Sequence, residues 1–209
     1  GVADRLNAVG GQQISLQGLN ARYDDVLLQL HGAHQAQNAA VALASVEAFV
    51  GAELDGDLVR SAFGEVTSPG RLEVVRRSPT VLVDSAHNPH GVRAALEAVQ
   101  DSFTFSPLVG VVSVMADKDV TGMLELLETA ADELVVTQSS VPRRLSADEL
   151  AAVAVPIFGP DRVSVEPRLD DAIETAVRLA EDTGDDVLSG SGVLVTGSVV
   201  TVGDARVLL

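Results

Sequence analysis

The sequence has no cysteine, no tryptophan, a single tyrosine and a single lysine among its 209 residues. The absence of cysteine excludes a disulfide framework, a thiolate metal site and a cysteine nucleophile. The most apolar stretch, residues 108–116, is far too short to span a bilayer, and the N-terminus lacks the apolar core of a signal peptide. We expect a cytoplasmic protein. Because the chain begins with Gly1 rather than Met, we also expect a fragment or a processed chain.

Basic residues are scarce as well. Lys and Arg number 14 against 30 Asp and Glu, which gives a formal net charge of −16. Such a surface repels phosphate backbones and anionic membranes, so neither nucleic acids nor membranes are expected partners. Hydrophobic residues make up 46% and charged residues 21% of the chain, which is typical of a folded globular protein rather than a disordered one.

The first third of the chain differs in pattern from the rest. Residues 12–17 and 25–31 read as two strands separated by a turn. Apolar residues then recur at helical spacing over residues 33–50, and a second amphipathic helix is expected around residues 58–66. The breaker cluster Thr67-Ser68-Pro69-Gly70 follows. It predicts a boundary between a domain of residues 1–68 and one of residues 69–209, with a hinge at the boundary.

Strands and helices alternate after this boundary. We expect strands at residues 72–77, 80–84, 108–114, 133–137, 163–166, 192–196 and 199–202, and helices at residues 89–101, 120–130, 146–153 and 169–182. This α/β alternation, with near-continuous Val and Leu strands, predicts a mostly parallel sheet covered on both faces. Ligands of such sheets bind beyond the carboxyl ends of the strands, so the loops at those ends are the candidate sites.

The loop after the second of these strands has the most suggestive side chains. Asp84 ends the strand, and Asn88 and Pro89 are suited to begin the next helix. The N–H groups of a helix start favour an anion, and the Asp84 carboxylate could accept hydrogen bonds from ribose hydroxyls. A plain helix start explains Asn88 and Pro89 but does not require Asp84 or His87. A metal trio of Asp84, His87 and His90 is disfavoured because nothing fixes the three on one face, so we expect no metal ligands.

Three further loop residues admit both a functional and a structural interpretation. Arg71 could bind a phosphate through both guanidinium nitrogens, or be a solvated linker residue. Lys118, the single lysine, follows a buried-type strand and precedes a helix. It could serve a site there, or it could be a solvated surface charge while Asp117 or Asp119 caps the helix. Ser198 interrupts two apolar runs; a hairpin there is favoured over a pocket wall with the hydroxyl facing a ligand.

One polar residue stands out in the first helix. Asn38 lies one turn into the helix among small residues. It could be a buried amide that reads the edge of a base, or a satisfied asparagine of the core. Both interpretations place it on the buried side of the helix.

Common nucleotide and nucleophile motifs are absent. The sequence contains no Gly-x4-Gly-Lys-[Ser/Thr] phosphate loop, no Gly-x-Gly-x-x-Gly fingerprint and no Gly-x-Ser-x-Gly elbow. The chain therefore carries no self-contained apparatus for hydrolysing a nucleotide.

In order and spacing, however, the loops together resemble folylpolyglutamate synthase/dihydrofolate synthase, a family of the Mur ligase superfamily. The motifs are Gly32…His34-Gln35…Asn38-Ala39-Ala40, Pro69-Gly70-Arg71-Leu72-Glu73, Asp84…Ala86-His87-Asn88-Pro89, Asp117-Lys118-Asp119 and Thr196-Gly197-Ser198…Gly203. They extend over nearly the whole chain. The Ala-His-Asn-Pro loop and the late Gly-Ser are the most specific of them.

The resemblance implies a fold and an activity. Residues 69–209 would form a Rossmann-like C-terminal domain of the Mur ligase type, and residues 1–68 the strand-and-helix tail of the central ATPase domain. The enzyme would use ATP to phosphorylate a carboxylate of folate or of dihydropteroate, and the α-amine of L-glutamate would attack the acyl phosphate. The phosphate loop and the principal Mg²⁺ ligands would lie in a missing N-terminal ATPase part. The chain is therefore expected to be inactive alone, and we expect a monomer.

The resemblance also implies residues that bind the nucleotide. Asn38 would lie at the adenine, Arg71 at the phosphates and Asp84 at the ribose. Lys118 matches the Asp-Lys-Asp motif of the family, with no role assigned.

Other residues would bind the incoming glutamate. His87, Asn88 and Ser198 match substrate-binding positions, and His87 would be the catalytic residue. Two departures from the family pattern occur: Ser85 stands where glycine is frequent, and valines at residues 199–200 stand where a Leu-Tyr pair is common. The second departure puts an aromatic contact there in doubt.

Two other functions compete with this one. The chain could belong to a Mur-type ligase that joins amino acids to a cell-wall precursor, or be a nucleotide-binding module without chemistry of its own. The Gly32…His34-Gln35 and Gly197-Ser198 motifs favour the folate branch. A phosphate loop encoded upstream of Gly1 would favour a ligase over a module.

Overall fold

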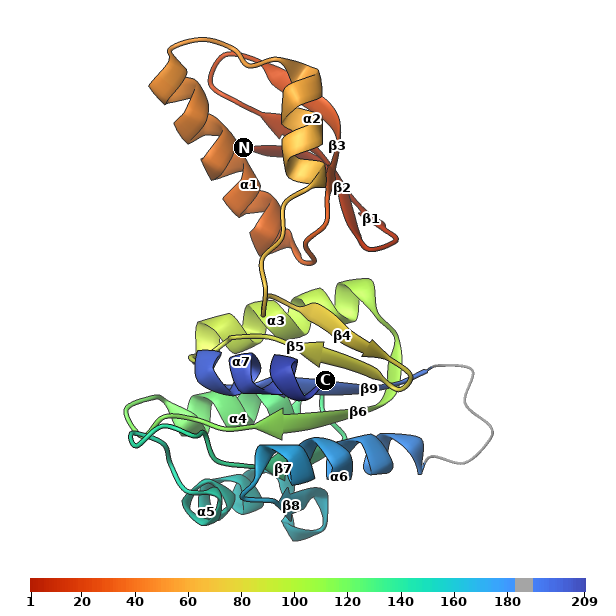
Figure 1. Cartoon of the computed structure of the whole chain (residues 1–209), viewed down its shortest axis with the longest axis vertical. Helices are drawn as coiled ribbons and strands as arrows, with labels where there is room; N and C mark the ends of the chain where they lie inside the picture. The colour runs from red at the N-terminus through yellow and green to blue at the C-terminus, as the bar shows by residue number, and fades with distance from the viewer. Residues whose placement is uncertain (183–189) are drawn as a thin grey trace. The chain divides into compact units, whose positions relative to one another are not determined.

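The computed structural model describes residues 1–182 and 190–209. The chain divides into two compact units (Figure 1). The first contains Gly1–Pro69 with Glu97–Phe103, and the second contains Gly70–Leu96 and Thr104–Leu209. Each unit has its own hydrophobic core.

The first unit combines a three-stranded antiparallel sheet with two helices. Strands β1 (Val2–Ala8), β2 (Gly11–Gln17) and β3 (Arg22–Leu28) lie in the order β1-β2-β3. Helices α1 (Ala33–Val50) and α2 (Gly56–Gly64) share a core with β2 and β3. The sequence did not predict β1, because its residues do not alternate between buried and exposed positions. Pairing with β2, rather than its own pattern, makes it a strand.

Helix α1 buries a narrow stripe that excludes Asn38. The buried apolar residues of α1 are Ala36, Ala39, Ala40 and Leu43. Asn38 is exposed, and its Nδ2 donates to Oε1 of Gln35 at 3.1 Å. The expectation of a buried asparagine is therefore wrong. The reason is geometric: Asn38 is two residues from both Ala36 and Ala40, and two residues along an α-helix correspond to a rotation of about 200°.

The second unit is built on a six-stranded sheet in the order β4-β5-β9-β6-β7-β8. Its strands are β4 (Glu73–Arg77), β5 (Thr80–Val83), β6 (Phe105–Val112), β7 (Glu133–Val136), β8 (Val163–Val165) and β9 (Gly190–Thr196). Neighbouring strands from β5 to β8 pair in parallel, whereas β4 pairs with β5 in antiparallel fashion. The predicted α/β fold with a mostly parallel sheet is confirmed.

Helices cover both faces of this sheet (Figure 1). On one face, α6 (Leu169–Glu181) and α7 (Val199–Leu208) pack against valines of β5, β6, β7 and β9. On the other lie α3 (Pro89–Ser102) and α4 (Val120–Glu128). Burial on both faces explains why the central strands are runs of Val and Leu rather than alternating sequences.

Helix α5 (Ala147–Phe158) follows β7 and begins as the sequence predicts. The Ser146 hydroxyl accepts the Glu149 N–H, and the Glu149 carboxylate accepts the Ser146 N–H, which together form a capping box. The helix continues past the predicted end at residue 153 and contains Pro156. A short 3₁₀ turn (Pro160–Arg162) connects it to β8.

The predicted last strand, residues 199–202, is wrong, because these residues begin helix α7. The run Val199-Val200-Thr201-Val202 is β-branched and locally favours a strand. In the structure, Gly197 turns the chain with a φ of 99°, and the helix buries Val202 and Ala205 on the sheet. Burial against the sheet thus overrides local propensity.

Candidate functional site

The carboxyl ends of β5 and β9, neighbours in the sheet, bring two predicted loops together. The Gly197 N–H donates to the Ala86 carbonyl at 3.0 Å, so the loop of His87 and the turn of Ser198 lie side by side. A Cβ at Gly197 would come 2.4 Å from the Ser113 carbonyl oxygen, which only glycine avoids. This edge of a parallel sheet is where ligands bind in such folds.

The Asp84 carboxylate is buried, with 5% of the residue exposed, and is held by backbone groups. Its Oδ2 accepts the N–H of Leu72 at 2.8 Å, and its Oδ1 accepts the N–H of Ala86 at 2.8 Å. A carboxylate has about four lone-pair sites, so the ribose contact expected of Asp84 would have to use those that remain. In the structure, Asp84 joins the turn after Arg71 to the loop before His87.

The turn that carries Arg71 is fixed on both sides. The Gly70 carbonyl accepts the Ser85 N–H at 2.8 Å, and the Gly70 N–H donates to Oε2 of Glu73 at 2.8 Å. Gly70 and Leu72 have φ values of 72° and 42°, and the latter is uncommon for a residue with a side chain. Arg71 is exposed, and its guanidinium has no hydrogen-bond or ion-pair partner in the described part of the chain. It can therefore receive an anion.

His87 and Asn88 lie where β5 leads into α3. The His87 Nδ1 is 3.0 Å from the Ser85 carbonyl oxygen. Because a carbonyl only accepts, this contact favours a proton on Nδ1 and leaves Nε2 with a lone pair. Asn88 is exposed, and its Oδ1 accepts the Gly91 N–H at 2.8 Å. The predicted helix-start role of Asn88 is confirmed, and its NH₂ group remains a donor.

Ser198 is the N-cap of α7. The residue is 3% exposed, and its Oγ accepts the Val200 N–H at 3.2 Å. The hairpin favoured from the sequence is therefore wrong. The capping bond uses the oxygen of Ser198 as an acceptor and leaves its O–H free to donate.

Lys118 lies in the loop between β6 and α4. Its Nζ is 3.4 Å from Oδ2 of Asp117, while Oδ1 of Asp119 accepts the Gly122 N–H at 3.0 Å and caps α4. Burial raises the pKa of Asp117. A hydrogen bond from its own backbone N–H and the charge of Lys118 lower the pKa and outweigh the effect of burial, so it lies below its ordinary value. The alternative that Asp119 caps the helix is confirmed.

Metal ligands do not gather in the described residues. Within residues 1–182 and 190–209, no group of three or more His, Asp or Glu side chains could hold a metal ion. The acidic side chains nearest the predicted site, Asp84 and Glu73, already accept backbone N–H groups. The donor set thus suits an anion at Arg71 better than a cation. None of the described helices is both long and apolar enough to cross a membrane.

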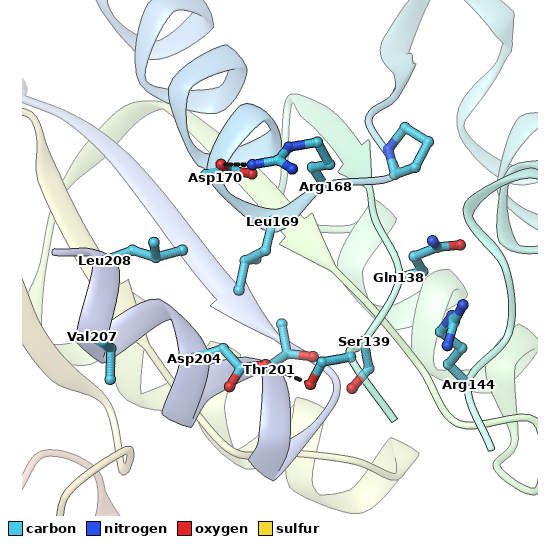
Figure 2. Close-up of a pocket in the computed structure, with 12 residues that line it drawn as sticks. Gln138, Ser139, Arg144, Arg168, Leu169, Asp170, Thr201, Asp204, Val207 and Leu208 are labelled. Carbon is cyan, nitrogen blue, oxygen red and sulfur yellow. Dashed lines mark hydrogen bonds and ion pairs between the residues drawn. The ribbon is translucent and has the colours of Figure 1, made fainter. Parts of the chain in front are cut away.

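A cavity of about 540 Å³ lies elsewhere in the second unit (Figure 2). Segments after β7 and β8 and one side of α7 form it: Gln138, Ser139, Ser140, Arg144, Pro167, Arg168, Leu169, Asp170, Thr201, Asp204, Val207 and Leu208. Leu169 points into the space, and Arg168 is paired with Asp170 (Figure 2). None of the site residues predicted from the sequence lines this cavity.

The sequence did contain a signal for this cavity. Its polar residues follow the expected strands 133–137 and 163–166, so the strand-end rule that singled out Asp84 applies to them too. One lining hydroxyl is buried: Oγ of Ser139 has no hydrogen-bond partner among the described residues. The strand-end position could be predicted from the sequence, but the burial of a hydroxyl could not, because it depends on the tertiary structure.

Comparisons with known proteins agree with this architecture. Residues 70–199 match the family described as Mur ligase, glutamate ligase domain. The dihydrofolate synthase/folylpolyglutamate synthase of Mycobacterium tuberculosis is 51% identical over 217 residues, covering 99% of this chain and 45% of that protein. The Bacillus subtilis protein of the same name is 29% identical over 199 residues, covering 94% and 44%. A crystal structure of M. tuberculosis folylpolyglutamate synthase complexed with ADP and AMPPCP has a TM-score of 0.96 at 53% identity, covering 99% and 47%.

The chain therefore belongs to the Mur ligase family, and residues 70–199 correspond to its glutamate ligase domain. Within that family it is similar to the folylpolyglutamate and dihydrofolate synthases. The chain spans about half the length of the curated relatives that it matches.

Proposed function

We propose that this chain is part of an ATP-dependent ligase that adds L-glutamate to folate. The observation that carries the proposal is the 51% identity to the M. tuberculosis dihydrofolate synthase/folylpolyglutamate synthase across 99% of the chain. In this reaction ATP phosphorylates a folate carboxylate, and the α-amine of glutamate displaces phosphate to form the amide bond. We propose a monomer that acts in the cytoplasm.

Arg71 is the phosphate-binding residue in this proposal. It is exposed and carries no carboxylate partner among the described residues, so binding a phosphate breaks no existing ion pair. Its fork of N–H donors matches phosphate oxygens bidentately. Asn38, exposed on α1, is the proposed adenine contact. We expect the principal Mg²⁺ ligands outside this chain, where bound Mg²⁺ would neutralise charge during phosphoryl transfer.

His87 is the proposed catalytic residue. With Nδ1 turned to the Ser85 carbonyl, the Nε2 lone pair can accept a proton from the glutamate ammonium, and only a neutral amine attacks an acyl phosphate. The Asn88 NH₂ group and the Ser198 O–H are donors suited to the carboxylates of glutamate. The N-terminus of α3 favours negative charge at the same place.

The experiment is glutamate ligation by the full-length protein. Incorporation of labelled glutamate is measured with folate, with dihydropteroate and with a cell-wall precursor as acceptors, each with and without ATP. We expect ATP-dependent incorporation into folate, and the dihydropteroate reaction decides whether that acceptor is used. Incorporation into the cell-wall precursor alone would contradict the proposal. The 209-residue chain alone is expected to neither hydrolyse ATP nor ligate glutamate, because it lacks a phosphate loop.

A single substitution tests the assignment of His87. We expect His87→Ala to lower kcat and raise the KM for glutamate while leaving the KM for ATP within a factor of about two, since general base catalysis supplies about 10²–10⁴-fold. His90→Ala is the matched control, because His90 is exposed and is the second residue of α3. Equal effects of His87→Ala on the KM values of both substrates would show that the residue only shapes the loop.

A further inference from the structure

One buried carboxylate touches the backbone beside both of the proposed functional side chains. Oδ2 of Asp84 accepts the N–H of Leu72, the residue after Arg71, and Oδ1 accepts the N–H of Ala86, the residue before His87. Both distances are 2.8 Å. The direction in which each side chain leaves the backbone therefore depends on the same group.

Other contacts close this junction. The Ser85 N–H donates to the Gly70 carbonyl at 2.8 Å. Oε2 of Glu73 accepts both the Gly70 N–H and Nε of Arg206, each at 2.8 Å. A Cβ at Gly70 would lie 2.8 Å from Cγ1 of Val202, so the backbone here is packed directly against α7. The turn is thus a fixed part of the second unit rather than a loose linker.

Leu72 has an unfavourable backbone conformation that its bond to the Asp84 carboxylate maintains. Leu72 is 2% exposed and has a φ of 42°, a region that side-chain-bearing residues avoid. Such conformations persist only where the surrounding structure fixes them. The charge-assisted bond from the Leu72 N–H to Asp84 supplies that constraint, because bonds to a charged acceptor are about twice as strong as neutral ones.

We propose that Asp84 is a positioning residue that locks the Arg71 turn and the His87 loop into one rigid arrangement. This inference rests on the proposed function, in which Arg71 meets the phosphates of ATP and His87 the glutamate. Without the carboxylate, Leu72 relaxes towards negative φ and Arg71 leaves the backbone in another direction. Because Asp84 acts through Arg71, its effect on nucleotide affinity does not depend on the ribose hydroxyls.

The first part of the test measures amide hydrogen exchange and requires no activity. Asp84→Asn keeps the size of the side chain but replaces one acceptor oxygen with an NH₂ group. We expect the Leu72 and Ala86 amides to exchange about tenfold faster or more. Asp132→Asn is the matched control, because Oδ2 of Asp132 accepts the Leu108 N–H at 2.8 Å; it should accelerate exchange at Leu108 and not at the other two amides.

The second part measures nucleotide affinity of the full-length protein by calorimetry. Asp84→Asn is expected to weaken the binding of ATP and of 2′,3′-dideoxy-ATP by the same factor. That factor should be about tenfold or more, because one charge-assisted contact, between Arg71 and phosphate, is lost. Arg71→Ala should produce a similar loss. The double variant should bind no more weakly than Arg71→Ala alone, because both substitutions remove the same interaction.

Several outcomes would overturn the inference. Unchanged exchange at Leu72 and Ala86 would show that the carboxylate does not hold the turns. Normal dideoxy-ATP affinity in Asp84→Asn, with weakened ATP affinity, would identify a direct ribose contact instead. Additive losses in the double variant would show that Asp84 and Arg71 act separately. If the unaltered protein binds no ATP, the proposed function is wrong, and the exchange rates alone decide whether Asp84 holds the two turns.

Discussion

Each unit of this chain contains a buried carboxylate that accepts backbone N–H groups from another segment, and the two differ in what they hold. In the first unit, Glu47 accepts the N–H groups of Leu19 and Asn20 and the hydroxyl of Tyr23. In the second, Asp84 holds residues on either side of the proposed site. The same interaction is structural in the first unit, and we propose that it supports function in the second. Position at the carboxyl edge of a parallel sheet makes the difference.

The units differ also in how completely they cover themselves. The sheet of the second unit has helices on both faces, and its central valines are fully buried. Helix α1 of the first unit exposes several apolar side chains: Val41, Val46, Phe49 and Val50. Exposed apolar patches are typical of surfaces that contact something else. Helix α7 of the second unit also exposes Val199, Val207 and Leu208, so the fuller coverage of the second unit concerns its sheet and not its outer helices.

The largest effect is expected from the core of the second unit. Leu194, 1% exposed on β9, lies between β5 and β6, so Leu194→Ala should lower the free energy of unfolding by about 2–5 kcal/mol. Hydrogen exchange in β6 and β9 measures this loss. The fluorescence of Tyr23, the single tyrosine, reports on the first unit and should show an unchanged transition. A parallel shift of both signals would mean that the two units unfold together.

A pH-dependent effect is expected next, from Glu47. Burial raises the pKa of Glu47. Hydrogen bonds from the Tyr23 hydroxyl and from the backbone amides of Asn20, Leu19 and Ala21 lower it and outweigh the effect of burial, so the pKa lies below its ordinary value. A depressed carboxyl pKa stabilises the fold above the unfolded-state pKa of about 4.3, and this stability is lost as the pH falls through the folded-state value. The first unit should therefore unfold more readily in acid.

Glu47→Gln tests this effect. We expect the variant to be less stable than the unaltered chain at pH 7 and to depend less on pH below about 5, with Tyr23 fluorescence in urea as the measurement. Burial raises the pKa of Tyr23, and its Glu47 contact adds to this while the Leu54 backbone bond opposes it, so the phenol stays protonated and donating. In contrast to Asp84→Asn, Glu47→Gln should leave exchange at Leu72 unchanged. Equal acid sensitivity of both chains would refute the role of Glu47.

The smallest effect is expected at Phe49, which is 92% exposed on α1. Phe49→Gln should change the free energy of unfolding, measured in urea by Tyr23 fluorescence, by less than about 0.5 kcal/mol, as is usual for surface positions. Leu43→Ala, at a 3% exposed position of the same helix, is the contrast and should cost about 2–5 kcal/mol. A loss above about 1 kcal/mol in Phe49→Gln would show that its ring is packed within the unit.

The resemblance to a family selected the candidate loops, although their geometry did not follow from it. Strand-end loops could be located because strands of Val and Leu are recognisable by composition. Of the site residues, the cap at Asn88 could be predicted because capping is a local interaction. The bonds from Asp84 to Leu72 and Ala86, the first spanning twelve residues, could not, because they depend on where two segments meet.

By itself the sequence determined the fold class, most helices and strands, and which loops hold polar side chains, since periodicity and caps act over a few residues. Only the tertiary structure decided that β9 lies between β5 and β6, that residues 199–202 are helical and that Asn38 faces solvent. Each of these depends on the surface that an element meets in the folded chain. Burial against a distant partner outweighs local propensities, which differ by less than about 1 kcal/mol per residue.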